Sequence, residues 1–482
     1  MKDAPKNIGI SFAGQYLELI MHFLAVLVLA RILTPEDVGT YSVAAFLMAV
    51  LHAFRDFGVV QYIIQEQELT INKIRSAMGV AIILALTVAL ILLASSGFIA
   101  RFYGNPSIEK ILMVMAGSFA ISPFGSLLSG LFRREMQLKK IFFVRMSSTL
   151  CHVVVAITCA LQGFGALSLA WANFAGILSF GIAASILRPK GHPWLPLFSN
   201  IKTILSFGSV ATIGNAANVA GTNVPDLIVG KVMDMSSVGY LSRANGLVQL
   251  FSRFLTDALM PLILPYFADV RRNGHDLAEH YKAAVVYLTG VAWPFFAGLL
   301  ILAYPMVRTL YGPQWDASVP LVELLCVAGA ISSVSMFAGQ VMVANGQVRN
   351  ATYSQLITQP FRIAAVFFAA TFSLIYIAFA LIAVEFLTLC IISWYLRKTI
   401  KVGLLGVLSA CGKSALITLC SAIVPLLVRF FWTDNQAHPS IPLTIGIVGA
   451  GIGWLSSILF TQHPFGPHLI SFLTAAKSKI FH

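Results

Sequence analysis

The sequence predicts an all-α membrane protein of about 14 transmembrane helices, arranged as two parallel six-helix repeats followed by two further helices. Hydrophobic residues make up 58% of the chain and charged residues only 11%, against roughly 25% charged residues in soluble domains. The mean hydropathy is +0.84. Apolar runs of about 20 residues, the length that crosses the hydrocarbon core as a helix, recur along the whole chain. A motif that occurs twice, described below, predicts the repeats.

The apolar runs define the predicted spans and the domain organisation. We expect an N-lobe at residues 1–195 with spans 1–6, a C-lobe at residues 196–400 with spans 7–12, and a final region at 401–482 with spans 13 and 14 and a cytoplasmic tail. The predicted spans are 8–32, 39–64, 76–100, 109–132, 142–163, 166–187, 201–229, 237–265, 282–304, 317–345, 350–372, 374–396, 410–432 and 441–462.

A helical hairpin motif occurs in both predicted lobes. Residues 29–42 (LARILTPEDVGTYS) match residues 229–242 (VGKVMDMSSVGYLS) without a gap, at an offset of 200. The Tyr-Gly pair that ends span 3 at 103–104 returns at 311–312, near the end of span 9. Six spans separate the two copies, so both copies have the same orientation and are related by an axis along the membrane normal. Transporters built in this way handle substrate near the midplane, between the repeats.

The distribution of Lys and Arg predicts the orientation in the membrane. If the N-terminus is cytoplasmic, 22 of the 32 cations fall in inner segments. Only six fall in outer segments and four lie inside spans. Short loops rich in Lys and Arg stay in the cytoplasm. We therefore expect both termini in the cytoplasm, and the same pattern explains the net charge of +13 without a nucleic-acid partner.

Four arginines inside spans are the candidate substrate-binding residues: Arg55, Arg243, Arg253 and Arg362. Ionisable groups deep in a membrane are costly and usually functional. Two interpretations are open. Either the arginines form a cationic cavity for an anionic substrate, for which phosphate matches the guanidinium fork, or they form buried salt bridges that fix the register of the helices.

Carboxylates in the same spans are candidates for ion coupling or for those salt bridges. They are Glu18, Asp56, Asp226, Asp257 and Glu385. Asp257 lies four residues after Arg253, on the same helix face, so the two can pair with each other.

Span 7 is unusually polar. Asn215 and Asn218 begin a stripe that Thr222 continues, at helical spacing. Such a stripe either hydrogen-bonds a neighbouring helix or lines a wet cavity that accepts sugar hydroxyls. Both interpretations stay open, and both asparagines are candidate substrate-binding residues.

The sequence offers no sign of catalysis, of a metal or of a cofactor. The six cysteines fall in or beside apolar segments, with no Cys-x-x-Cys pair and no His/Cys cluster at metal-ligand spacing. We expect them to be packing residues. The predicted outer loops are short and carry no paired-carboxylate motif, which argues against a membrane glycosyltransferase or polymerase.

Several segments resemble the bacterial polysaccharide-type, Wzx-like flippases of the multidrug/oligosaccharidyl-lipid/polysaccharide exporter superfamily. They are 30–41 (ARILTPEDVGTY), 54–58 (FRDFG), 132–136 (FRREM) and 239–244 (GYLSRA). The resemblance covers essentially the whole chain and does not specify which sugar is carried.

The resemblance implies a V-shaped pair of lobes that opens alternately to the two sides of the bacterial inner membrane. The implied substrate is an undecaprenyl-diphosphate-linked oligosaccharide for exopolysaccharide, capsule or O-antigen. A proton or sodium gradient is the implied drive, and membrane lipids, a polymerase and export proteins are the implied partners. Related flippases carry cavity arginines on spans 1, 2 and 8. Spans 2 and 8 match that pattern here, whereas span 1 carries Glu18.

The alternative within the superfamily is a multidrug exporter or cation antiporter. Cationic drugs would be repelled by arginines in the central spans, so the sequence favours the flippase.

Overall fold

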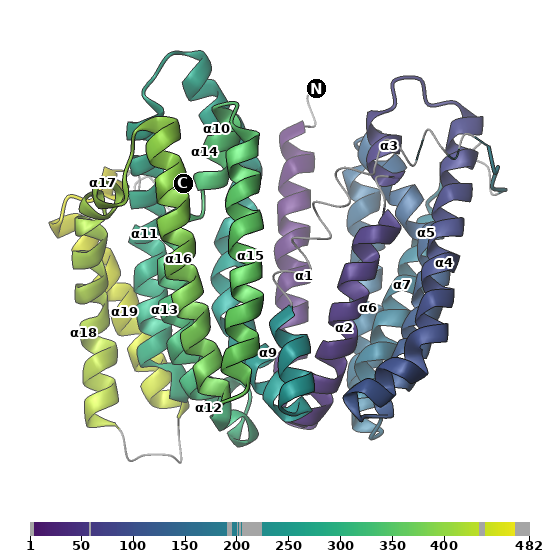
Figure 1. The fold of residues 1–482 in the computed structure, drawn as a ribbon, viewed down its shortest axis with the longest axis horizontal. Helices are drawn as coiled ribbons and strands as arrows, with labels where there is room; N and C mark the ends of the chain where they lie inside the picture. Colours follow the sequence, from purple (N-terminus) through teal and green to yellow (C-terminus); the bar gives the residue numbers. More distant parts are fainter. Residues whose placement is uncertain are drawn as a thin grey trace, which may run out of the picture. The chain divides into compact units, whose positions relative to one another are not determined.

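The structure is a computed structural model in which every regular element of the described residues is a helix (Figure 1). It describes residues 4–56, 59–189, 195–199, 201, 204, 224–432 and 439–467, and within these ranges the side chains of all but 4–13, 53–56 and 256–258. The prediction of an all-α chain is confirmed. The chain divides into two compact units, Met1–Gly239 and Tyr240–His482. The three-part division at 195 and 400 stays a prediction.

The first unit contains seven helices among its described elements. They are α1 (Ala4–Ile32), α2 (Pro35–Asp56), α3 (Val59–Gln65), α4 (Ile71–Tyr103), α5 (Ser107–Arg134), α6 (Leu138–Leu161) and α7 (Ala166–Ile186), and residues 224–232 are also helical.

The apolar core of the first unit lies between α3, α4, α5 and α7. Ile63 and Phe132 are completely buried there, together with Ala77 and Ala184. In Figure 1, α4, α5, α6 and α7 lie side by side. Small residues allow this close approach, as is usual between membrane helices. A Cβ on Gly125 of α5, for example, would lie 2.6 Å from the ring of Phe180 on α7.

Arg134 fixes the end of α3. Its guanidinium donates hydrogen bonds to the carbonyls of Ile63 and Glu66, at 2.8 and 2.5 Å. A cation at a helix C-terminus satisfies carbonyls that have no partner inside the helix. The arginine thereby holds α5 against the loop that connects α3 to α4.

The turn between α1 and α2 follows from its sequence. Thr34 precedes Pro35, the residue type most favoured at the first position of a helix. The backbone N–H of Asp37 donates to Thr34 Oγ1 at 3.1 Å, and Thr34 N–H donates to the Asp37 carboxylate at 3.1 Å. This reciprocal cap is a capping box with Asp in place of Glu. The other oxygen of Asp37 accepts from the N–H of Ala166 at 3.0 Å and so anchors the start of α7.

The corresponding turn in the second copy of the motif is capped in a related way. Ser237 N–H donates to the carboxylate of Asp234 at 2.7 Å, at the start of α9 (Met235–Phe251). Asp234 and Ser237 occupy the positions of Thr34 and Asp37 at the offset of 200.

The two turns meet through their glycines. A Cβ built on Gly39 would lie 1.7 Å from the carbonyl oxygen of Met235, and one on Gly239 would lie 2.0 Å from that of Pro35. The contact is reciprocal, because 35 and 235, like 39 and 239, are equivalent positions in the repeated motif. Only a residue without a Cβ permits backbones to approach so closely.

The second unit begins within α9 and is also helical throughout its described elements. It continues with η1 (Ser252–Thr256, a π-helical turn), α10 (Asp257–Arg272), α11 (Leu277–Ile301), α12 (Ala303–Leu310), η2 (Pro313–Ser318), α13 (Val319–Ser335), α14 (Ala338–Ala344), α15 (Val348–Ala370), α16 (Leu374–Ile400), α17 (Leu404–Ala410), α18 (Gly412–Phe431) and α19 (Ser440–Phe460).

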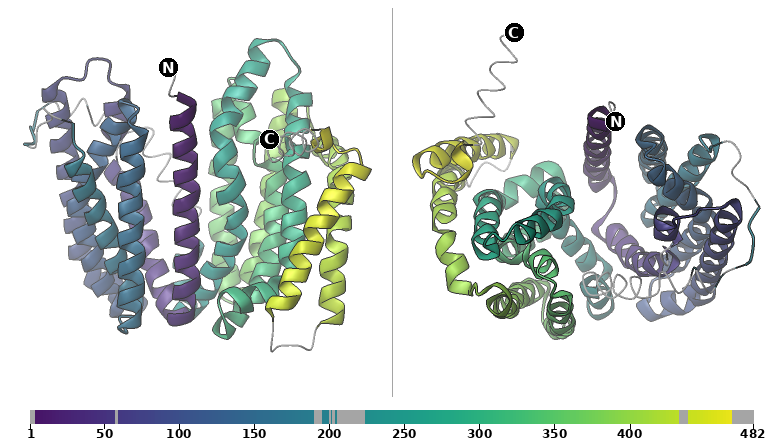
Figure 2. Two further views of the ribbon diagram at one scale, coloured as in Figure 1. Left: turned by 180° about the vertical axis from the view of Figure 1, so that it is seen from behind. Right: turned by 90° about the horizontal axis from the view of Figure 1, so that it is seen from above.

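α18 and α19 form a pair that packs on α11 in the second unit. In both views of Figure 2 they lie side by side. A Cβ on Gly449 of α19 would lie 2.1 Å from the side chain of Val424 on α18. Thr289 Oγ1 on α11 donates to Ser414 Oγ on α18 at 3.0 Å. Trp454 Nε1 on α19 donates to the carbonyl of Gly290 on α11 at 2.8 Å. Buried hydrogen bonds thus fix this pair on α11.

Ten helices among the described residues are long and apolar enough to cross a membrane, and an eleventh span appears if α9 and α10 are counted together. These eleven correspond to all the predicted spans except 39–64, 201–229 and 350–372. Most of 201–229 lies outside the described residues. The segment 39–64 is divided between α2 and α3. α15 ends at Ala370, two residues before the end of the predicted span 350–372, and is rich in polar residues. Fourteen spans in two repeats therefore stay a prediction.

Candidate functional site

The intramembrane arginines that the structure describes have three different environments. Arg362 on α15 contacts Glu385 on α16, with 2.5 Å between Nη2 and Oε1. The two side chains are only 17% and 19% exposed. Removing one partner of such a pair leaves a buried charge uncompensated. This geometry agrees with the salt-bridge interpretation of Arg362 and Glu385, and a role in binding substrate stays a prediction.

Arg243 on α9 stacks on aromatic rings. Its guanidinium carbon lies 5.1 Å from the ring centre of Trp315 and 5.6 Å from that of Tyr311. Trp315 on η2 is completely buried, and Tyr311 is nearly so. The buried Nε of Arg243 has no hydrogen-bond partner within the described part of the chain. Cation–π contacts of this kind attract a guanidinium to the faces of aromatic rings, so Arg243 is positioned by aromatic packing.

Arg253 differs from both, because its side chain is exposed. It lies on the π-helical turn η1, where the helix axis bends by 50° between 235–255 and 259–272. Single π-helical turns inside α-helices are frequent at functional sites. Prolines at 261 and 265 follow in α10. An exposed guanidinium in the middle of a predicted span is available to an anion.

Glu18 has a partner that the sequence analysis did not identify. Arg145 on α6 lies 3.7 Å from it, between Nη1 and Oε2. Arg145 follows the cations at 133, 134, 139 and 140, which are typical of a cytoplasmic loop. Its place four residues inside the predicted span 142–163 was the available signal.

Other candidate residues lie wholly or partly outside the described part. The backbone of Arg55 and Asp56 ends α2, and Asp257 begins α10, but their side chains are not described. Asn215 and Asn218 lie outside the described residues. Asp226 is half-buried in the helix at 224–232, where Tyr103 donates a hydrogen bond to the carbonyl of Leu227 at 3.4 Å.

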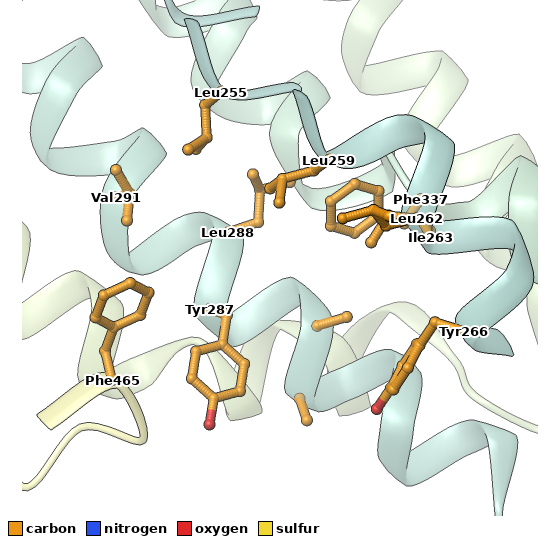
Figure 3. A pocket seen from close by; sticks show the side chains of 12 residues that line it. Leu255, Leu259, Leu262, Ile263, Tyr266, Tyr287, Leu288, Val291, Phe337 and Phe465 are labelled. Carbon is orange, nitrogen blue, oxygen red and sulfur yellow. The ribbon is translucent and has the colours of Figure 1, made fainter. Parts of the chain in front are cut away.

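The second unit contains an apolar pocket with a volume of about 530 Å³. Leucines of α10 line it on one side, and Tyr266, Tyr287 and Phe465 line another (Figure 3). Tyr287 donates a hydrogen bond to the carbonyl of Pro464 at 3.2 Å, which holds the segment after α19 against the pocket. The lining offers hydrocarbon contacts and very few polar groups.

The described residues contain no group of three or more His, Cys, Asp or Glu that could hold a metal ion. All six cysteines are free thiols.

Comparisons with known proteins identify the family. A family model described as polysaccharide biosynthesis protein matches residues 28–320. The succinoglycan biosynthesis transport protein ExoT of Rhizobium meliloti is 25% identical over 99% of this chain and 97% of its own length. The lipopolysaccharide biosynthesis protein WzxC of Escherichia coli is 23% identical over 67% of this chain and 66% of its own length. The teichuronic acid biosynthesis protein TuaB of Bacillus subtilis is 20% identical, with 83% of each chain covered.

Solved structures identify the fold. The lipid II flippase MurJ in an inward closed conformation superposes with a TM-score of 0.77 at 14% identity, covering 94% of this chain and 98% of its own. An inward-facing multidrug transporter of the MATE family gives a TM-score of 0.67 at 12% identity, covering 81% and 98%. The prediction of a transporter rather than an enzyme agrees with these matches. The chain belongs to the polysaccharide biosynthesis protein family and is a multi-pass membrane protein with the fold of the flippase MurJ and of a MATE-family transporter.

Proposed function

We propose that the protein flips undecaprenyl-diphosphate-linked oligosaccharide repeat units from the cytoplasmic to the periplasmic leaflet of the bacterial inner membrane. The repeat units serve exopolysaccharide, capsule or O-antigen synthesis, and the two lobes open alternately to the two sides. The names of the relatives support this proposal, since they include transport and biosynthesis proteins for several bacterial polysaccharides. The fold shared with a lipid II flippase supports it as well.

The exposure of Arg253 is the observation that most directly links the proposed function to one residue. Arg362 is compensated by Glu385 and Arg243 is stacked on two aromatic rings, whereas Arg253 is exposed on a π-helical turn. A diphosphate accepts two parallel hydrogen bonds from a guanidinium. Arg253 is therefore our first candidate for the diphosphate. Arg55, at a matching depth in the other predicted repeat, is the second.

The remaining candidates have secondary roles in the proposal. Asn215 and Asn218 contact sugar hydroxyls, and Arg243 and Arg362 contribute positive charge near the path of the substrate. Flipping is driven by a proton or sodium gradient, with Glu18, Asp56, Asp226, Asp257 and Glu385 as the carboxylates that bind the ion or balance the arginines. Membrane lipids surround the protein, and a polymerase and export proteins use its product.

Export of polymer by substituted proteins tests the proposal. Replacing Arg253 with Ala removes a charged hydrogen bond worth about 1.5–3 kcal/mol, so we expect binding to weaken by about 10- to 100-fold. Arg253→Lys restores export in part, because an ammonium keeps the charge and loses the fork. Exported polymer and membrane-inserted protein are measured in a strain that lacks the native gene.

Arg272→Ala is the matched control. Arg272 lies on α10 with its side chain 75% exposed, and it pairs with Asp269, whose side chain is 61% exposed, at 3.1 Å. We expect this variant to export normally, because exposed pairs contribute little. Full export by Arg253→Ala at a normal protein level would contradict the assignment of Arg253.

A further inference from the structure

Two histidines face each other inside the first unit, on helices α1 and α6. The rings of His22 on α1 and His152 on α6 have their centres 5.4 Å apart, with an angle of 63° between their planes. Both side chains are half-buried, and both residues lie well inside helices of the length and hydropathy of membrane spans. Titratable side chains at such depth are usually functional.

The histidines are one layer of the contact between α1 and α6. In the first layer a Cβ on Gly14 would lie 2.4 Å from the ring of Phe142. In the second layer Glu18 contacts Arg145 at 3.7 Å. His22 follows Glu18 by four residues and His152 follows Arg145 by seven, so each pair lies on one helix face. The histidine pair is therefore the next layer of the same contact.

Among the described residues, the helices around the pair carry few charged side chains. On α1 and α6 the charged residues nearest to the histidines in sequence are Glu18 and Arg145, which pair with each other. The neighbouring helix α7 contains no ionisable side chain at all. On α5, which also contacts α6, the ionisable residues are confined to the two ends of the helix: Glu109, Lys110, Arg133 and Arg134.

We propose that the His22–His152 pair is a binding site for a single proton, and that this proton couples flipping to the proton gradient. Imidazole is the side chain whose charge ordinarily changes near physiological pH. Two rings about 5 Å apart oppose a second proton, because like charges at short range disfavour each other. The pair therefore titrates as one unit. The coupling rests on the proposed function, whereas the binding of the proton does not.

A bound proton changes the contact between α1 and α6. Because Glu18 and Arg145 pair with each other, protonation of the histidine pair adds one positive charge to the layered contact. A charge is disfavoured in a dry, low-dielectric contact. Protonation hence favours conformations in which water reaches the seam between α1 and α6, and loss of the proton favours the packed contact. A ligand that binds one conformation better shifts the population toward it.

Titration of the protein without substrate tests the binding site. The full-length protein with ¹³C-labelled histidine is placed in lipid nanodiscs, and its imidazole signals are followed by NMR from about pH 5 to pH 8, around the ordinary histidine pKa. His22→Gln and His152→Gln identify the two signals. We expect the pair to take up one proton in total, and the remaining ring to take up a full proton by itself once its neighbour is replaced.

The matched control for the titration is His52→Gln. His52 lies on α2, inside the predicted span 39–64, and its ring centre is 4.4 Å from that of Phe119. This change should leave the titration of the other two rings as it was. Rings that stay constant over the range, or that each take up a full proton independently, would overturn the proposal.

Flipping in vesicles tests the coupling. Vesicles hold the protein and a fluorescent lipid-linked oligosaccharide, and the distribution of the lipid between leaflets is measured with and without a pH gradient. One proton per lipid permits about tenfold accumulation for one pH unit, equivalent to about 1.4 kcal/mol. We expect His22→Gln/His152→Gln to lose this accumulation while still flipping without a gradient, and His52→Gln to keep it.

The outcomes separate the two proposals. Undiminished accumulation by the double variant, or flipping by the unsubstituted protein that ignores the gradient, would overturn the coupling. Absence of all flipping by the unsubstituted protein would instead contradict the proposed function, and the NMR titration would still decide whether the pair binds a proton. If the double variant does not insert, the single variants give the same comparison, because each removes half of the site.

Discussion

His463, after the end of α19, is a buried histidine whose surroundings favour the neutral ring. Burial lowers the pKa of His463, and the nearby charge of Lys413 lowers the pKa further. The N–H of Phe465 donates to Nδ1 at 3.3 Å, so Nδ1 acts as an acceptor. Nε2 lies 3.4 Å from Ser414 Oγ, on the helix pair that packs against α11. A second proton would have to sit on Nδ1, where it would meet the N–H of Phe465, which is a donor and not an acceptor.

We expect the second unit to lose stability as the pH falls below about 6.5, the ordinary histidine pKa. The unfolded state binds more protons than the folded state in this range, so acidification favours unfolding. The contribution is fully present above that pH and is lost as the pH falls through the lowered pKa of the folded state. His463→Gln should flatten this dependence, as measured by thermal unfolding at several pH values. His275→Gln, at an exposed histidine, should keep the slope of the unsubstituted protein, and an unchanged slope in His463→Gln would show that another group is responsible.

At the scale of single residues, some contacts could be predicted from the sequence and others could not. The salt-bridge interpretation of Arg362 and Glu385 was available from their depth in neighbouring spans. The pairing of Glu18 with Arg145 could not be predicted, because spacing along one helix does not show which residue of another helix lies opposite it. The same limit applies to His22 and His152, which are 130 positions apart in the sequence.

Among the elements, the crossing of α2 and α9 depends on glycine. Gly39→Ala places a methyl group 1.7 Å from the carbonyl oxygen of Met235, and the backbone of a helix cannot give way as a side chain can. Overpacking costs about 1–3 kcal/mol. We expect the free energy of unfolding to fall by about 3 kcal/mol or more, at or above the upper end of that range. Thermal unfolding and the amount of inserted protein measure it.

Gly298→Ala is the control for this prediction. Gly298 lies within α11, and a Cβ there would have no atom within 4 Å. The better helix propensity of Ala should leave stability unchanged or raise it by up to about 1 kcal/mol. Equal stability of Gly39→Ala and Gly298→Ala would show that α2 and α9 can move apart at their crossing without a loss of stability.

The elements were predictable where apolar length alone decides, as in α4, α5 and α19. Prediction is harder where polar residues interrupt a span. α15 has the length to cross a membrane, yet Gln355, Gln359 and Arg362 lower its hydropathy, and only its packing against α16 shows why they are tolerated. The π-helical turn at Arg253 is another such case, because nothing in the hydrophobic pattern specifies i→i+5 hydrogen bonds.

For the whole molecule, the distribution of cations predicts the topology. Reporter fusions after Gln137 and Arg397 should be cytoplasmic, and fusions after Tyr103 and Thr433 should be periplasmic, because Lys and Arg in short loops stay inside. The two fusions expected in the cytoplasm and the two expected in the periplasm serve as controls for each other. In the first unit Tyr103 precedes α5 and Gln137 follows it, and α5 is 28 residues long. A periplasmic signal at Gln137 would reverse the orientation.

The transporter class followed from composition and from the repeated hairpin, and the family comparisons agree with it. The glycan did not follow, because sugars are recognised by a few hydroxyl contacts that leave no fixed sequence pattern. The coupling ion did not follow either, since a carboxylate in a membrane helix serves a salt bridge and an ion site equally well.

The reciprocal contact of Gly39 and Gly239 has a further consequence. Position 39 meets 235 and position 239 meets 35, which is the pattern of an isologous interface in a symmetric dimer. In a homodimer one glycine would serve both sides of such a contact, whereas here Gly39 and Gly239 are separate positions of one chain. Substitutions at Gly39 and at Gly239 can therefore be made separately, which no homodimer would allow, and their comparison would reveal how far the two halves have diverged in what they require of this crossing.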